Sequence, residues 1–308
     1  SKPQTETKMN RLRKSDTKRT VRSNFFHTQR IGMAVGMLSV LCVLGTPALT
    51  QPTGYLAGKG KGEYEFETAL KPIPNVALTE LHRGMTFGFL AKNGYFSSRE
   101  ALPQLDRMKA LGVTWVSLVV ILMQENFAST RVFSDYEFTA SDGELEAMIA
   151  EIHRRGMRVM LYTCLEMHDS NWRGRIAFPS PGQQIQGIEI DYWSQWFRSY
   201  TAAMVNYGRL AQRAGAELLG LGAEMDGTVQ QNAHWSKLID EMRRVYAGPL
   251  AYEVHGAIDF DHLPAWYRKL DIVGYSFYRP VATKPGATNE EMKPVIEAQV
   301  ADMKRLAE

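Results

Sequence analysis

The stretch AELLGLGAEMDG, residues 216–227, is an apolar run that ends in two acidic residues, Glu224 and Asp226. A carboxyl group at the end of a buried strand can donate or accept a proton when its surroundings tune its pKa. Small residues that would leave room for a ligand or a neighbouring side chain precede the first acid: Gly220, Gly222 and Ala223. A purely structural role for Glu224, such as capping a helix or pairing with an arginine, is the competing interpretation.

Further polar and aromatic residues follow other apolar runs of the chain. They are Glu166, His168, Asp169, Trp172, Arg173, Glu253, His255, Tyr275 and Tyr278. A surface that mixes carboxylates with Trp and Tyr suits a sugar, because the apolar faces of a sugar ring stack on aromatic rings and its hydroxyl groups bond to charged side chains. These residue types therefore indicate a carbohydrate site.

Spacings typical of several other chemistries are missing. The sequence has no HxH, HExxH or CxxC spacing, and the adjacent His168 and Asp169 would diverge on an extended backbone, so we expect no metal site and no cofactor. A GxSxG motif is also missing, which excludes the commonest arrangement of a serine hydrolase. Cys164 lies in an apolar run and the only other cysteine is Cys42, so we expect a buried thiol without a catalytic role.

Alternating strands and helices must position these groups. The predicted strands are near-continuous apolar runs, as parallel strands covered by helices are, at 85–90, 114–122, 158–165, 217–223, 250–254 and 271–277. Helices are predicted to stop at Gly112, Gly156 and Gly215, because glycine tolerates the left-handed conformation that ends a helix.

An aromatic stripe marks the helix that begins after Asp191, a favourable N-cap. Its apolar residues recur every three or four positions: Trp193, Phe197, Tyr200, Met204, Tyr207 and Ala211. This spacing predicts packing against a core, so we assign the stripe no chemistry.

The alternation predicts an α/β domain with a parallel sheet, and the long segments 123–141 and 166–190 after strands two and three favour a (β/α)8 TIM barrel over an open sheet. No strand is followed by a GxGxxG or GxxxxGK turn, which such open sheets often carry. Six βα units are visible in residues 81–308, whereas a closed barrel has eight, so we expect a barrel truncated after the sixth unit. In a barrel, the carboxyl ends of the strands form the active site, which is where Glu224 would lie.

The N-terminal part of the chain has a different character. Residues 1–30 hold nine Lys and Arg against two acidic residues, and residues 31–50 are uncharged and largely apolar, the order of a signal peptide or a signal anchor. We therefore expect residues 1–50 to be disordered or membrane-targeting, the protein to be exported to the extracellular space or periplasm, and residues 31–50 to be able to attach it to a membrane. Residues 51–80 are predicted to be a linker and lead-in.

Charge and composition narrow the class of partner. With 308 residues, 44% of them hydrophobic, the chain can bury a large core. Beyond residue 50 it carries 27 basic and 31 acidic residues, and this mildly acidic balance argues against a nucleic-acid partner.

Several segments, taken in order, resemble the mannanases of glycoside hydrolase family 113. They are GMTFGF at 84–89, EALPQLDRMKALGVTWVSLVVILMQ at 100–124, HRRGMRVMLYTCLEM at 153–167, DSNWRGRI at 169–176, GLGAEM at 220–225, WSKLIDEMRRVYAGPLAYE at 235–253 and LDIVGYSFYRP at 270–280. The resemblance implies a (β/α)8 barrel that cleaves β-1,4-mannosidic bonds with retention, using a strand-four Glu as general acid/base and a strand-seven Glu as nucleophile.

Position by position, the resemblance implies that Glu224 is the acid/base and that Trp172 and Arg173 line the sugar cleft. It also implies that Tyr278 lies beside the nucleophile. Asp226 and Glu253, on the same rim, are further expected sugar contacts. The nucleophile would follow Glu308, so we expect residues 1–308 alone not to hydrolyse a substrate. The sequence departs from the family at three positions, Ala223, Glu253 and His255, and these departures bear on the preferred sugar.

Three alternatives remain open at this point. Glu253 or Glu166 could supply the second carboxylate, because their strands flank strand four. The protein could instead be a non-catalytic carbohydrate-binding or cell-envelope protein on a barrel scaffold, since a fold does not dictate function. A barrel enzyme of another class is the third alternative.

Overall fold

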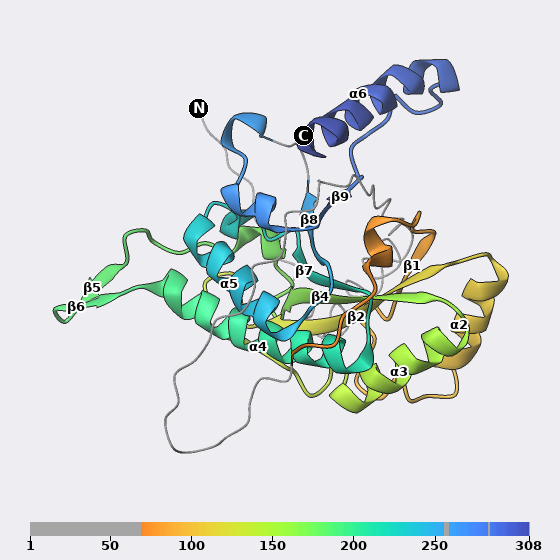
Figure 1. Ribbon diagram of the computed structural model, residues 1–308. Coiled ribbons are helices and arrows are strands. Elements are labelled where there is room, and N and C mark those ends of the chain that lie inside the picture. The colour runs from red at the N-terminus through yellow and green to blue at the C-terminus, as the bar shows by residue number, and fades with distance from the viewer. Residues whose placement is uncertain (1–68, 256–258, 283, 308) are drawn as a thin grey trace, which may run out of the picture. The chain divides into compact units, whose positions relative to one another are not determined.

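The computed structural model describes residues 69–255, 259–282 and 284–307. Its main sheet contains six parallel strands in the order β1-β2-β4-β7-β8-β9, which is also their order along the chain (Figure 1). Their bounds are β1 (Gly84–Phe87), β2 (Trp115–Gln124), β4 (Arg158–Met167), β7 (Leu218–Ala223), β8 (Leu250–His255) and β9 (Ile272–Ser276). The sheet curls as an open half-barrel with six of the eight strands of a (β/α)8 fold, which confirms the predicted fold class.

Helices connect most successive strands and lie on the outer face of the sheet (Figure 1). They are α2 (Ala101–Ala110), α3 (Asp142–Arg154), α4 (Tyr192–Ala214) and α5 (Asn232–Val245), with α6 (Asn289–Ala307) after β9. Short 3-10 helices precede β1 (η1, Asn75–Leu78), follow β4 (η2, Arg173–Arg175) and β7 (η3, Asp226–Thr228), and connect β8 to β9 (η4, Phe260–His262, and η5, Ala265–Lys269). The turns η2 and η3 follow β4 and β7 at the rim where the site was predicted.

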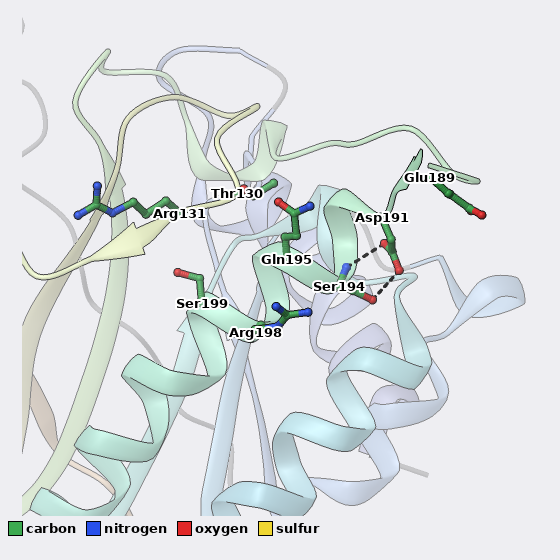
Figure 2. Close-up of a pocket in the computed structure, with 8 residues that line it drawn as sticks. All are labelled: Thr130, Arg131, Glu189, Asp191, Ser194, Gln195, Arg198 and Ser199. Carbon is green, nitrogen blue, oxygen red and sulfur yellow. Dashed lines mark hydrogen bonds between the residues drawn. The ribbon is translucent and has the colours of Figure 1, made fainter. Parts of the chain in front are cut away.

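The predicted helix ends are confirmed. Gly112, Gly156 and Gly215 have φ values of +80°, +68° and +76°, the left-handed conformation that stops a helix. At the other end of α4, the Asp191 side chain accepts hydrogen bonds from the Ser194 backbone N and Oγ, as expected of an N-cap (Figure 2).

The long rim segments contain short elements that the sequence did not predict. Strand β3 (Val132–Phe133) pairs antiparallel with the end of β2. Strands β5 (Gln183–Ile185) and β6 (Ile188–Ile190) form a hairpin that extends from the start of α4 (Figure 1). Strand β1 also ends three residues earlier than predicted, because Gly88 and Leu90 have positive φ and cannot continue an extended strand.

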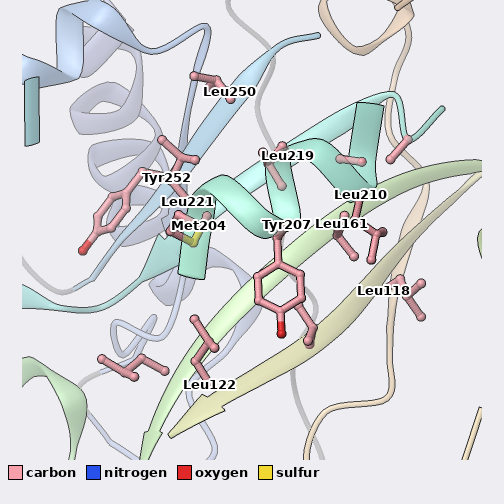
Figure 3. Packing of buried hydrophobic residues seen from close by; sticks show 14 of the residues in the cluster. Leu118, Leu122, Leu161, Met204, Tyr207, Leu210, Leu219, Leu221, Leu250 and Tyr252 are labelled. Carbon is pink, nitrogen blue, oxygen red and sulfur yellow. The ribbon is translucent and has the colours of Figure 1, made fainter. Parts of the chain in front are cut away.

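Side chains alternate between two apolar layers along the strands. Leu118 and Leu122 of β2 belong to the core between sheet and helices, while Val119 and Ile121 belong to a separate cluster inside the curl of the sheet (Figure 3). The predicted aromatic stripe of α4 is wholly buried in the first layer: Trp193, Phe197, Tyr200, Met204, Tyr207 and Ala211. The stripe thus packs in the core, as its spacing predicted.

The lead-in to the first strand packs at the amino ends of the strands. Ala77 of η1 is fully buried there, beside residues of four strands: Trp115, Leu218, Ala251 and Ile272. The predicted basic arm and signal segment, residues 1–50, and most of the linker lie outside the described residues. Within the described ranges, no helix is both long and apolar enough to cross a bilayer.

A bulge at Gly222 shapes the end of β7. The register between β7 and β8 shifts between Gly220 and Ala223, and Gly222 has a φ of +125°. A Cβ at Gly222 would lie 2.6 Å from Met225 Cε and 2.7 Å from Tyr200 Oη. The predicted room beside the small residues is therefore taken by neighbouring side chains, and the bulge re-aims the residues that follow.

We predict that Gly222→Ala lowers the free energy of unfolding by about 1–3 kcal/mol, because alanine at this φ is strained and its methyl group meets two side chains. Urea unfolding followed by circular dichroism measures the change. Gly143→Ala is the control, because Gly143 lies in α3 with nothing within 4 Å of an added Cβ, and it should leave stability unchanged or slightly raised. Equal effects of both substitutions would contradict the role of the bulge.

Candidate active site

Glu224 follows β7 directly and has a left-handed backbone, with a φ of +54°. Such a conformation is uncommon for a residue other than glycine and costs on the order of 1 kcal/mol. Its backbone N donates a hydrogen bond of 3.0 Å to the Glu253 carbonyl O on the next strand, which helps to hold it. Strain of this kind clusters at functional sites, and here it places a carboxyl group with 12% side-chain exposure at the carboxyl ends of the strands.

The guanidinium of Arg173 lies against this carboxyl group and is 6% exposed. Its Nη2 donates to Glu224 Oε2 at 3.0 Å and its Nη1 donates to Glu166 Oε1 at 2.7 Å. Its Nε donates to the Ala223 carbonyl O at 3.1 Å, so each of the three guanidinium nitrogens has an acceptor. One buried positive charge is thus shared between two carboxylates from different strand ends.

Trp172 contacts the same carboxylate oxygen as Arg173. Its Nε1 lies 3.4 Å from Glu224 Oε2, whereas Glu224 Oε1 has no hydrogen bond within the described part of the chain. The Trp172 side chain folds back over Gly174, where an added Cβ would lie 2.4 Å from the indole ring. Trp172 is nevertheless 40% exposed, so its ring is available to a ligand beside Glu224.

A second glycine lets the loops after β4 and β7 approach closely. A Cβ at Gly227 would lie 2.0 Å from the Ile176 carbonyl O, so only glycine fits between the two loops. This contact fixes η3 against η2, the turn that carries Arg173. Gly227 thus allows the loop that carries Arg173 to lie close to the segment that follows Glu224.

Strand alternation places Glu166 next to this pair. Tyr162 and Cys164 of β4 face the inner cluster, and Glu166 continues the same face at the end of the strand. Burial raises the pKa of Glu166, and the Arg173 charge opposes that shift. Burial also raises the pKa of the Cys164 thiol, which disfavours the reactive thiolate, in agreement with the inert role expected for it.

Asp226 and His255 form a second polar pair on the other side of Trp172. His255 Nδ1 lies 3.3 Å from Asp226 Oδ2, and the His255 ring meets the Trp172 ring edge-on with centroids 5.0 Å apart. Burial raises the pKa of Asp226, while His255 acts in the opposite direction. The Asp226 and His255 side chains remain partly exposed, so both can meet a ligand that lies on Trp172.

Glu253 points into the curl of the sheet. Its Oε2 accepts from the Tyr162 hydroxyl at 2.8 Å and its Oε1 accepts from Ser276 Oγ at 2.5 Å. The two carboxylate oxygens therefore have partners on β4 and β9, and the backbone carbonyl O accepts from the Glu224 backbone N. The structure places Glu253 beneath Glu224 as a support.

Tyr278 lies beyond the end of β9 and is 54% exposed. Burial raises the pKa of its hydroxyl, and the negative charges of Glu253 and Glu224 add to that shift, so the ring lies within the field of both carboxylates. Tyr275, named on the rim from sequence, is buried in the core instead.

The remaining rim residues turn away from Glu224. His168 Nε2 lies 3.3 Å from Asp135 Oδ2 and its ring stacks on Phe133, while the Asp169 carboxylate accepts from the backbone N and side chain of Asn171. Across residues 69–255, 259–282 and 284–307, no group of three or more His, Cys, Asp and Glu side chains is placed to hold a metal ion.

A separate hollow of about 550 Å³ lies beside the N-terminal end of α4 (Figure 2). It is lined by polar residues alone: Thr130, Arg131, Glu189, Asp191, Ser194, Gln195, Arg198 and Ser199. None of the predicted site residues lines it, and it offers no aromatic ring on which a sugar could stack. The acidic, aromatic and guanidinium groups meet at Glu224 instead, which makes the rim around Glu224 the candidate site.

The sequence predicted that Glu224, Trp172 and Arg173 lie at the same rim of the barrel. It assigned Glu166 no single role. The period-two alternation of β4, which puts Tyr162, Cys164 and Glu166 on one face, is the signal that could have singled it out. The support of Glu253 by Tyr162 and Ser276 needed the strand register and was missed.

We predict that Arg173→Met lowers the free energy of unfolding at neutral pH by about 3–5 kcal/mol, because two carboxylates lose the buried charge they share. The deficit should shrink in acid, where protonation removes the charge of Glu166, whose pKa is raised. Urea unfolding at pH 7 and pH 4 measures both effects. Arg175→Met is the matched control, since Arg175 is exposed, and it should cost at most about 1 kcal/mol.

The family model of glycoside hydrolase family 113 matches residues 85–306 of the chain. Among solved structures, the chain is similar to a family 113 β-1,4-mannanase, with 26% identity and a TM-score of 0.61 over 71% of this chain and 67% of that chain. It is also similar to the family 113 β-mannanase AaManA from Alicyclobacillus acidocaldarius in complex with ManMIm, with 27% identity and a TM-score of 0.59 over 70% of this chain and 67% of that chain. None of the curated proteins matches the sequence.

Proposed function

The chain belongs to glycoside hydrolase family 113, and we propose that it acts on β-1,4-linked mannose-containing chains by retaining hydrolysis with Glu224 as general acid and base. The match to β-1,4-mannanases supports the substrate class. The observation that carries the mechanism is the asymmetric environment of the Glu224 carboxyl group. Arg173 and Trp172 both hold Oε2, and Oε1 is left for a reacting group.

In the proposed reaction, Glu224 donates a proton to the glycosidic oxygen as the bond from that oxygen to the anomeric carbon breaks. A second carboxylate attacks the anomeric carbon and forms a glycosyl-enzyme intermediate. Water then gives its proton to Glu224 as its oxygen attacks the same carbon, which releases the sugar and the attacking carboxylate. Retention needs the two carboxyl groups about 5 Å apart.

The second carboxylate is proposed to come from the seventh strand of the barrel, as the family resemblance implies. The two local alternatives fit the role poorly. Glu253 has both oxygens engaged by Tyr162 and Ser276, and Glu166 Oε1 accepts a 2.7 Å hydrogen bond from the buried Arg173 guanidinium, which weakens it as a nucleophile.

The exposed rings beside Glu224 are proposed to bind the sugar chain. Trp172 offers an apolar ring next to the catalytic carboxyl group, and Tyr278 offers a second one beyond β9. The Asp226 and His255 pair, edge-on to Trp172, would bond to sugar hydroxyl groups. Of the predicted contact residues, Trp172, Asp226 and Tyr278 thus have surfaces that a sugar can reach, whereas Arg173 is buried and Glu253 is held by Tyr162 and Ser276.

We also propose that the protein acts outside the cytoplasm. The basic residues 1–30 and the apolar residues 31–50, in the order of a signal peptide, support export. A mature N-terminus found by mass spectrometry after residue 50 would support cleavage of the segment.

We predict that Glu224→Gln in the full-length protein slows hydrolysis of mannopentaose by about 10²-fold or more, because glutamine cannot supply the proton. Binding of the pentaose, measured by calorimetry, should persist. Initial rates and the anomer first formed, read by proton NMR, test the acid/base role and retention together. Glu189→Gln, an exposed change on the β5–β6 hairpin, should leave the rate unaltered. Unchanged turnover in Glu224→Gln would refute the assignment, and wild-type binding without turnover would favour a non-catalytic binding protein.

We predict that Trp172→Ala weakens mannopentaose binding by about 10-fold or more, because the exposed indole ring beside Glu224 is lost. Calorimetry measures the dissociation constant. Tyr136→Ala removes another exposed ring, one in the segment between β3 and α3, and should leave binding intact. Equal weakening by both changes would place the sugar elsewhere.

A further inference from the structure

We infer that Glu166 is a positioning residue that keeps the proton on Glu224 by sharing the guanidinium of Arg173. This inference rests on the acid/base role proposed for Glu224. Its basis is the geometry of one buried guanidinium between two carboxylates, at 2.7 Å from Glu166 Oε1 and 3.0 Å from Glu224 Oε2.

The contact between Arg173 and Glu224 poses a chemical conflict for a general acid. A guanidinium beside a carboxyl group favours the ionised form, because opposite charges attract strongly where water is largely excluded. A general acid must nevertheless hold its proton until the leaving oxygen takes it. An arginine that served Glu224 alone would therefore work against the proposed reaction.

Glu166 removes much of this conflict. Its carboxylate accepts a hydrogen bond from Arg173 Nη1, while Glu224 accepts from Nη2. The positive charge of Arg173 thus interacts with two acidic side chains, each of which is negative when ionised. The negative charge of Glu166 also repels a second negative charge on Glu224. Both effects make ionisation of Glu224 less favourable, while Arg173 keeps its orienting hydrogen bond to Oε2.

Other titratable groups face Glu224 or the residues bonded to it. They are Tyr162, Cys164 and Glu166 from β4, Arg173 from η2, Asp226 from η3, Glu253 and His255 from β8, and Tyr278 beyond β9. Among the acidic residues that the structure describes, only Glu166 accepts a hydrogen bond from the same guanidinium, that of Arg173, as the Glu224 carboxylate. The coupling through Arg173 therefore distinguishes Glu166 from the other acidic neighbours.

The sign of the pH dependence follows from the ionisation of Glu166. Its influence on Glu224 exists only while Glu166 is ionised, that is, above its raised pKa, and it fades as the pH falls through that value. We therefore expect Glu166 to affect the alkaline limb of the plot of activity against pH, because the general acid Glu224 loses its proton there.

The test is the titration of Glu224 in Glu166→Gln. Glutamine keeps the size of the side chain and can still accept from Arg173, but it has no charge. The carboxyl 13C signal of Glu224, assigned by its loss in Glu224→Gln, should titrate at a midpoint about 1 pH unit lower than in the wild type. The alkaline limb of kcat/KM for mannopentaose in the full-length protein should move down by the same amount.

Glu125→Gln is the charge-matched control. It removes one negative charge from the same rim, at the end of β2, from an exposed side chain without a hydrogen bond in the described ranges. Its Glu224 midpoint should equal that of the wild type. Glu166→Asp restores the charge and should bring the midpoint back toward the wild-type value.

Unchanged midpoints in Glu166→Gln, or equal shifts in Glu166→Gln and Glu125→Gln, would overturn the inference. Glu166→Ala should lower the Glu224 titration midpoint in the same way, and it replaces Glu166→Gln if that variant does not fold. The two proposals fail separately. If Glu224→Gln loses turnover but the Glu224 titration midpoint is unchanged in Glu166→Gln, only the positioning role of Glu166 is refuted. If Glu224→Gln keeps full turnover, the acid/base role of Glu224 is refuted.

Discussion

The buried guanidinium of Arg173 joins the parts of the candidate site. It bonds to a carboxylate at the end of β4, to a carboxylate just after β7 and to the backbone of β7 itself. Such a charge is stable out of water only when every donor group has an acceptor, and the loop that carries it must therefore close onto β7. Closure of that loop also brings Trp172 to Glu224 Oε2, while Glu224 Oε1 has no hydrogen bond to any residue that the structure describes.

The backbone of β7 is arranged to meet this loop. Straight alternation from Gly220 would send Ala223 toward the helices, yet Ala223 packs with the inner cluster, because the bulge at Gly222 shifts the register. Glu224 then takes a left-handed conformation secured by the carbonyl O of Glu253. The strain is offset by the bonds that the carboxyl group gains, so an unfavourable backbone and a buried ion pair occur together at the same residue.

Much of this arrangement could be predicted from the sequence, and the limits have physical causes. Membership of family 113, predicted from motifs such as GLGAEM and DSNWRGRI, is confirmed by the family match, and the six strands and the helix-ending glycines lie where the patterns put them. Long buried elements are predictable because hydrophobic period and glycine conformation are local properties. The β5–β6 hairpin escaped prediction because it is short and largely exposed, so burial left little periodic signal in its sequence.

The pairing of side chains across strands was harder to foresee. The competing interpretation of Glu224, a carboxylate paired with an arginine, turned out to describe its contacts correctly, yet the ion pair lies at the strand ends beside an exposed Trp172. Pairing and catalysis are thus compatible, on the condition that the arginine is shared. An Arg173 that bonded to Glu224 alone would favour the ionised form of Glu224. The second carboxylate that accepts from Arg173 is Glu166. In the sequence, only the alternation of side chains along β4 indicates that Glu166 points inward. The proton needed for the proposed reaction then depends on a residue that need not touch the substrate. The place of Glu224 at a strand end could be predicted from a motif, whereas the arginine that it shares with Glu166 became visible only when the loop after β4 and the end of β7 were placed together.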